Sequence, residues 1–174
     1  GTGLEKIYET ADGSFISECD WSQDGTLIAL KTNNAKGYEA SIFTIDVKGF
    51  ERDKIISGIK GAAGGLNISV DKKFLLFTRD ISGIENDYYR QLNTRLYIYY
   101  FETRQIVDIS RQKEDGTLDL DPRISPDEAR VIFVNTASDG KEVHKILFQD
   151  INPDEEDGVY LFNREELFLN ATMP

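Results

Sequence analysis

The sequence predicts an all-β fold made of three copies of one four-stranded antiparallel unit, and three observations support this prediction. The first is a motif that occurs three times, in which an apolar residue is followed by serine, one variable residue and aspartate. The second is a run of strand-forming residues shortly after each motif. The third is the spacing of the motif aspartates, which recur after 47 and 56 residues. The motif residues are Ser22, Asp24, Ser69, Asp71, Ser125 and Asp127.

Each motif is typical of a tight turn that joins two strands. Serine is favoured at the first position of a type I turn, proline at the second and glycine at the fourth. Pro126 follows the third serine, and Gly25 ends the first copy. The short aspartate side chain can accept hydrogen bonds from nearby backbone N–H groups and hold the corner. We therefore interpret the serines and aspartates as structural turn residues between the two strands of a hairpin.

Each predicted hairpin is followed by two more strand-like segments, so one unit contains four strands. Repeats of about 40–45 residues with four antiparallel strands are typical of β-propeller blades, and loop insertions explain the longer steps. The sequence thus predicts one propeller-type domain over residues 1–174, with blades near residues 15–57, 64–110 and 118–170. The added strand segments are residues 42–46 and 54–57, then 96–100 and 105–110, then 159–163 and 166–170.

The segments between these units complete the predicted architecture. Residues 4–10 are expected to form an extra leading strand, the fourth strand of a blade that is otherwise missing. Residues 145–148 are expected to add a strand inside an insertion. The glycine-rich residues 61–65 lack the Gly-Lys-Ser/Thr ending of a phosphate-binding loop, so an inter-blade turn is favoured. Cys19 lies beside Trp21 in a predicted inner strand, which favours a small buried hydrophobe over a nucleophile.

The repeated motif resembles the propeller repeat of TolB-like proteins. The signature of that family is Pro-x-Trp-Ser-Pro-Asp-Gly, then an apolar strand, then Ile-Tyr-x-x-Asp. Residues 122–127 and 21–25 keep most of the first part, and residues 41–46 keep the later part. The middle copy keeps little beyond Ser69 and Asp71, although the resemblance extends over nearly the whole chain. Family members include periplasmic partner-binding proteins and accessory domains of peptidases and polysaccharide-degrading enzymes. The resemblance therefore implies a periplasmic or secreted location.

Composition argues against two classes of partner. The formal net charge is −11, from 31 acidic and 20 basic residues, and no cluster of Lys and Arg offers phosphates a basic field. No apolar stretch approaches the eighteen residues of a membrane-spanning helix. The acidic surface either keeps the protein soluble and its sheet edges apart, or docks a basic partner or a divalent cation.

Two inserted segments, residues 80–94 and 137–157, form the predicted binding surface. Long loops on a rigid scaffold often carry binding residues, and Tyr and Arg are common anchors of interfaces. The candidate binding residues are Tyr88, Tyr89, Arg90 and His144. The alternatives are that the tyrosines pack over a blade edge and that His144 is an ordinary loop histidine.

No catalytic motif and no cofactor are predicted. His144 is the only histidine, and neither Gly-x-Ser-x-Gly nor His-Glu-x-x-His occurs. Asp150, Asn152 and Asp154 have a spacing that suits calcium, but the glycine and closing glutamate of the twelve-residue loop are absent, and a solvated acidic turn is favoured. We expect a non-catalytic binding or scaffold module for a protein or glycan. The alternative is a propeller segment of a peptidase or polysaccharide-degrading enzyme.

Three blades do not close a ring of the usual four to eight. An open fan would expose an apolar face at each end, and such faces favour association. One solution is a homodimer in which two chains close a six-bladed ring. The other is that the chain is part of a longer propeller.

Overall fold

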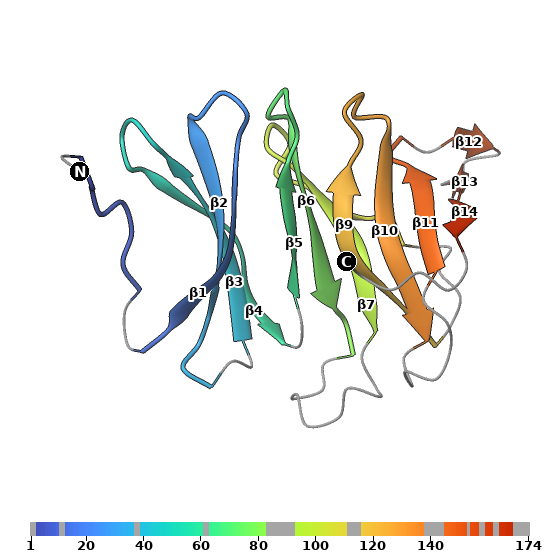
Figure 1. Cartoon of the computed structure of the whole chain (residues 1–174), viewed down its shortest axis with the longest axis horizontal. Helices are drawn as coiled ribbons and strands as arrows, with labels where there is room; N and C mark the ends of the chain where they lie inside the picture. The colour runs from blue at the N-terminus through green and yellow to red at the C-terminus, as the bar shows by residue number, and fades with distance from the viewer. Residues whose placement is uncertain are drawn as a thin grey trace.

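The computed structural model describes residues 3–10, 13–36, 39–60, 63–82, 93–110, 116–137, 145–152, 154–156, 159–161 and 164–168. Within these ranges the chain is all-β and forms three four-stranded antiparallel sheets, as the sequence predicts. The sheets stand side by side along the long axis of the molecule (Figure 1). None of these residues belongs to a helix that is long and apolar enough to span a bilayer. Each four-stranded sheet is one blade.

The strands follow chain order within each blade, apart from an inserted hairpin in the third. The first blade contains β1 (Phe15–Trp21), β2 (Leu27–Asn33), β3 (Glu39–Asp46) and β4 (Arg52–Lys60). The second contains β5 (Ala63–Ile68), β6 (Phe74–Asp80), β7 (Thr94–Tyr100) and β8 (Ile106–Asp108). The third contains β9 (Thr117–Ile124), β10 (Arg130–Ala137), β11 (Lys145–Asp150) and β14 (Arg164–Phe168). Strands β12 (Asp154–Glu156) and β13 (Val159–Leu161) pair with each other.

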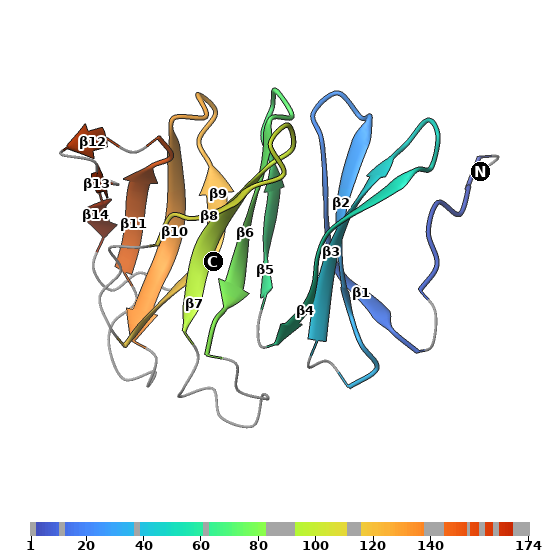
Figure 2. The same cartoon turned by 180° about the vertical axis from the view of Figure 1, so that it is seen from behind.

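The inner strands β1, β5 and β9 run along the face seen in Figure 1. The view from behind shows the outer strands β4 and β8 on the opposite face (Figure 2). The three hairpin corners, β1–β2, β5–β6 and β9–β10, therefore lie along one edge, the upper edge in Figure 1.

The third strand of the third blade differs from the prediction, whereas β14 supplies the fourth strand close to the predicted residues 166–170. Residues 159–163 were expected to supply its third strand, but β11 takes that place and pairs with β10 along its whole length. The apolar run of β11 follows β10 after a short connection, so it meets the open edge of β10 first. Strand β13 pairs with β12 instead.

Residues 4–10 do not form the predicted leading strand, and no sheet includes them. They are held by side chains instead. Tyr8 packs against the buried cluster of Ile28, Leu30 and Ile45 on the first blade, and its ring lies below the guanidinium of Arg52. Because the segment lies against the face of the sheet rather than along its edge, its backbone has no strand to pair with.

The core consists mainly of apolar layers between neighbouring blades. Leu75, Phe77 and Tyr97 pack towards the first blade, whereas Leu76 and Ile98 pack towards the third. The middle blade is therefore buried on both faces, which confirms the prediction for its third strand.

The expected burial of Cys19 is wrong, because its side chain is exposed. Cys19 lies opposite Leu30 in the β1–β2 ladder, and Trp21 lies opposite Ile28. Residues paired in this way share one face of the sheet. Here it is the face that points away from the second blade, so among the described residues no neighbouring sheet covers it.

Candidate functional site

The three serine–aspartate corners are structurally equivalent, which confirms the predicted turn role. In each corner the serine hydroxyl donates to the aspartate and accepts from the backbone N–H five residues further on. The hydroxyl–carboxylate distances are 2.8 Å for Ser22–Asp24, 2.9 Å for Ser69–Asp71 and 2.5 Å for Ser125–Asp127. The same bond is the main reason that the pKa of Asp127 lies below its ordinary value. These residues therefore shape the edge on which the site is built.

In the second and third corners, the residue after the aspartate links its blade to the preceding one. This position has positive φ in all three corners, 72° at Gly25, 56° at Lys72 and 57° at Glu128. The Nζ of Lys72 lies 2.5 Å from the Asp24 carboxylate, and this bond is the largest cause of the lowered pKa of Asp24. Glu128 accepts a hydrogen bond from the backbone N–H of Val70. The side chains at this position thus fix the spacing of the corners.

The inner strands are joined by hydrogen bonds from side chains to backbone. Glu18 accepts from the N–H of Leu66 at 2.8 Å, and Asp20 accepts from the N–H of Ile68 at 2.7 Å. On the other side, Asn67 donates to the carbonyl of Pro122 at 2.9 Å. Strands β1, β5 and β9 therefore form one continuous surface, although no ladder connects them.

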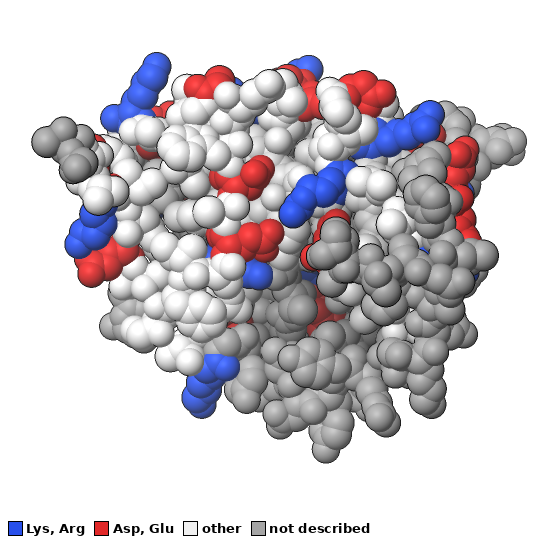
Figure 3. Space-filling view, viewed as in Figure 1, with Lys and Arg blue, Asp and Glu red and all other residues white. Residues whose placement is uncertain are grey.

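A cavity of about 400 Å³ lies where these three inner strands run into their corners. We call it the corner groove. Trp21 and Val70 line it although they are 60% and 52% exposed, so the groove offers apolar surface to solvent. Acidic side chains lie along this edge, with Lys and Arg side chains among them (Figure 3). The lining residues are Asp20, Trp21, Gln23, Asn67, Ile68, Val70, Ile124, Ser125, Pro126 and Glu128.

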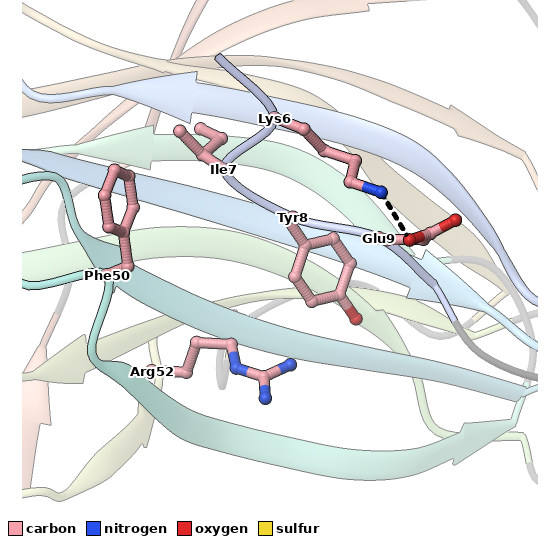
Figure 4. Close-up of a pocket in the computed structure, with 6 residues that line it drawn as sticks. All are labelled: Lys6, Ile7, Tyr8, Glu9, Phe50 and Arg52. Atoms are coloured by element: carbon pink, nitrogen blue, oxygen red, sulfur yellow. Dashed lines mark hydrogen bonds and ion pairs between the residues drawn. The ribbon is translucent and has the colours of Figure 1, made fainter.

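A second hollow of about 300 Å³ lies between the N-terminal segment and the first blade. Figure 4 shows the ring of Tyr8 between this segment and Arg52. Lys6 and Glu9 pair with each other at 2.7 Å, and Arg52 lies 5.6 Å from the centre of the Tyr8 ring. These contacts hold the segment on the blade, so we interpret the hollow as structural.

A buried polar cluster joins the second and third blades. Asp119 is completely buried and lies 2.7 Å from Nη2 of Arg164. Its carboxylate also accepts from Ser110 at 2.6 Å and from Asn135 at 2.8 Å. All these groups are satisfied within the protein, so the cluster links blades and offers nothing to a ligand.

The predicted binding residues Tyr88, Tyr89, Arg90 and His144 lie outside the described residues. Asp80 closes the base of the first loop by accepting from the N–H of Asn93 at 2.6 Å. The ends of this loop, and those of the β10–β11 connection, lie at the edge opposite the corners (Figure 1). Of the predicted surface 137–157, the described residues before and after β11 lie at opposite ends of that strand.

The calcium candidate stays a prediction. Asp150 lies 3.4 Å from the guanidinium of Arg130, Asn152 is exposed, and the side chain of Asp154 is outside the described part. Within the ranges that the structure describes, no three His, Cys, Asp or Glu residues come together as metal ligands.

Sequence reasoning missed the corner groove because it combines residues from three blades. One signal was present in the sequence. The glycine that ends the first motif is replaced by Lys72 and Glu128 in the other two copies, and these long charged side chains occupy a position that favours glycine.

No protein-family model matches the sequence, and no curated protein matches it. Solved structures do match. TolB from Acinetobacter baumannii is 25% identical with a TM-score of 0.58 over 83% of this chain and 31% of that chain. A putative TolB from Agrobacterium tumefaciens is 19% identical with a TM-score of 0.60 over 86% and 47%. The tricorn protease is 14% identical with a TM-score of 0.65 over 89% and 17%.

These similarities and the three sheets show that the chain has the fold of consecutive β-propeller blades. Its structure is similar to TolB and to the propeller of a protease, and it spans less than half the length of each of these proteins.

Proposed function

We propose that the chain is a non-catalytic binding or scaffold module, and that the corner groove holds its protein or glycan partner. The observation that carries this proposal is a groove along the three corners whose lining includes the exposed side chains of Trp21 and Val70. Binding sites are typically hollows with apolar walls and a few placed polar groups. Tryptophan is also among the residues that contribute most to interfaces.

The groove is held rigidly, which favours binding. Asp20 is fixed by the N–H of Ile68, and Glu128 is fixed by the N–H of Val70. Lys72 ties the second corner to the first through Asp24. A site whose side chains are already ordered loses less conformational entropy when a partner binds.

The polar groups of the groove support binding rather than catalysis. Ser125 is the one hydroxyl among the described lining residues, and it donates to Asp127 while accepting from the N–H of Arg130. An activated serine needs a general base within hydrogen-bonding reach, and a carboxylate that holds a turn supplies no imidazole.

A second candidate is a propeller segment of a peptidase or polysaccharide-degrading enzyme. The similarity to the tricorn protease favours it, because this chain covers a small part of that protein. In this case the chemistry would lie elsewhere in the complete enzyme.

Trp21 allows a direct test because it is the only tryptophan in the chain. A partner selected on protein and glycan arrays should change the fluorescence of Trp21 and should not be chemically altered. The variant Trp21→Ser should lose this binding. The matched control is Ile81→Ser, which replaces another exposed apolar residue, 40% exposed, at the opposite edge. Binding that survives Trp21→Ser would overturn the assignment of the groove, and turnover would favour the enzyme class.

A further inference from the structure

We propose that the corner groove recognises a basic side chain, foremost arginine, presented by an extended peptide segment of a partner protein. This inference rests on the proposed function and names the chemistry of its ligand. It follows from the charge of the groove, from the position of Trp21 and from the apolar wall between them.

The described lining of the groove carries negative charge and no cationic side chain. Asp20 and Glu128 are the charged members of its described lining. Each carboxylate uses one oxygen to accept from a neutral backbone N–H of the neighbouring blade. The second oxygen of each takes no hydrogen bond from any described residue, so each carboxylate has a free acceptor.

Two lysines of the second corner are already paired with aspartates. Lys72 contacts the Asp24 carboxylate and donates to the hydroxyl of Thr26 at 2.9 Å. Lys73 lies 2.7 Å from Asp71 within its own corner. The described lining therefore contains two carboxylates and neither lysine nor arginine, a charge pattern that is complementary to a cationic ligand.

Trp21 also lines the groove, from the face of β1 opposite to Asp20, and adds an aromatic ring to it. A guanidinium or ammonium group is attracted to the face of an aromatic ring, and tryptophan is the best of the three ring types. The aliphatic stem of such a side chain can pack on Val70, Ile124 and Pro126 while its charged end reaches a carboxylate. Arginine suits this arrangement better than lysine, because its planar group stacks on aromatic rings and presents several donors.

The same features disfavour other ligands. A net charge of −11 repels nucleic acid and acidic peptides. A neutral glycan could stack on Trp21, but it would leave both carboxylates without a counter-charge. The structure therefore favours a protein partner with an exposed basic residue over a glycan.

The test titrates the whole chain with three capped pentapeptides that differ only in the central residue, and follows Trp21 fluorescence. The central residues are arginine, its uncharged analogue citrulline, and glutamate. A chelator is present so that divalent cations do not contribute. We expect the arginine peptide to bind about tenfold more tightly than the citrulline peptide, and the glutamate peptide to bind least. Added salt should weaken the binding of the arginine peptide more than that of the citrulline peptide.

The charges are then removed without removing the hydrogen bonds. In Asp20→Asn and Glu128→Gln the amide oxygen can still accept from the N–H of Ile68 or Val70. Each change should weaken arginine binding by about two- to fivefold. Glu165→Gln makes the same charge change on the exposed surface of β14 and should leave binding unchanged.

Equal binding of the arginine and citrulline peptides, or no effect of Asp20→Asn and Glu128→Gln, would overturn this inference. If a glycan or a neutral peptide instead changed Trp21 fluorescence, the inference would fall while the groove would stand as a binding site. If no array partner depended on Trp21, both proposals would fall.

Discussion

Substituting alanine for Gly65 tests how closely the second and third blades approach each other. Gly65 in β5 has a φ of 62°, and a Cβ at this position would lie 2.3 Å from Cδ of Pro122 and 2.8 Å from its Cγ. Gly58 in β4 provides a matched control. Its φ is 67°, and a Cβ there would meet nothing within 4 Å.

Both substitutions carry the same backbone cost. An L-residue in the left-handed region is destabilised by about 1–2 kcal/mol. Gly65→Ala adds an overlap with a proline ring, which is fixed to its own backbone and has no other rotamer to adopt. Overpacking of this kind costs about 1–3 kcal/mol more. We therefore expect Gly65→Ala to lower the free energy of unfolding by about 2–5 kcal/mol, and Gly58→Ala by about 1–2 kcal/mol.

Urea unfolding followed by far-UV circular dichroism measures the difference, provided that the slope of the transition is unchanged. The double variant Gly65→Ala/Pro122→Ala should recover part of the loss, since it removes the two ring carbons while the backbone nitrogen stays 3.3 Å from the new Cβ. Equal costs for the two glycines, within about 0.5 kcal/mol, would refute the close approach of β5 and β9.

Three further predictions concern stability and assembly. Asp119→Ala should destabilise the fold by about 3–5 kcal/mol, because the Arg164 side chain, 14% exposed, loses its buried counter-charge. A decrease in the free energy of unfolding of less than about 1 kcal/mol in the same urea assay would contradict this. The pKa of Asp24 is lowered, first by the bond from Lys72, from an ordinary value of 3.8. The ionised Asp24 carboxylate therefore stabilises the fold fully above pH 3.8, and this stabilisation is lost as the pH falls further. Acid unfolding should start at lower pH in the wild type than in the variant Lys72→Gly. Closure of a ring by two chains predicts a mass near twice 19.7 kDa in light scattering, and a mass of one chain would exclude it.

The corners were predictable because their hydrogen bonds are local. Ser22 and Asp24 contact each other and the next few residues, so their spacing in the sequence determines the contact. The strand order of the third blade was not predictable in this way. Residues 145–150 and 159–163 both have a strand-like composition, and the choice between them depends on which segment pairs with β10.

Burial also depended on neighbours that a sequence does not reveal. The alternation of β1 predicts two faces, but not that the face with Cys19 and Trp21 would lack a covering sheet among the described residues. The corner groove is harder still, since it combines Trp21, Val70 and Glu128 from three different repeats. Only the long charged residues that replace the motif glycine hinted at contacts between repeats.

The hydrogen bonds between neighbouring blades determine which positions of the sequence can be substituted without losing them. Glu18, Asp20 and Glu128 each accept through a side-chain carboxylate, whereas the neighbouring blade donates only a backbone N–H. Every residue except proline has that group. These hydrogen bonds therefore do not depend on the side chains at the donor positions Leu66, Ile68 and Val70, whereas they do depend on the accepting carboxylates. Substitutions at the N–H donor positions can therefore accumulate while the hydrogen bonds between the blades are kept.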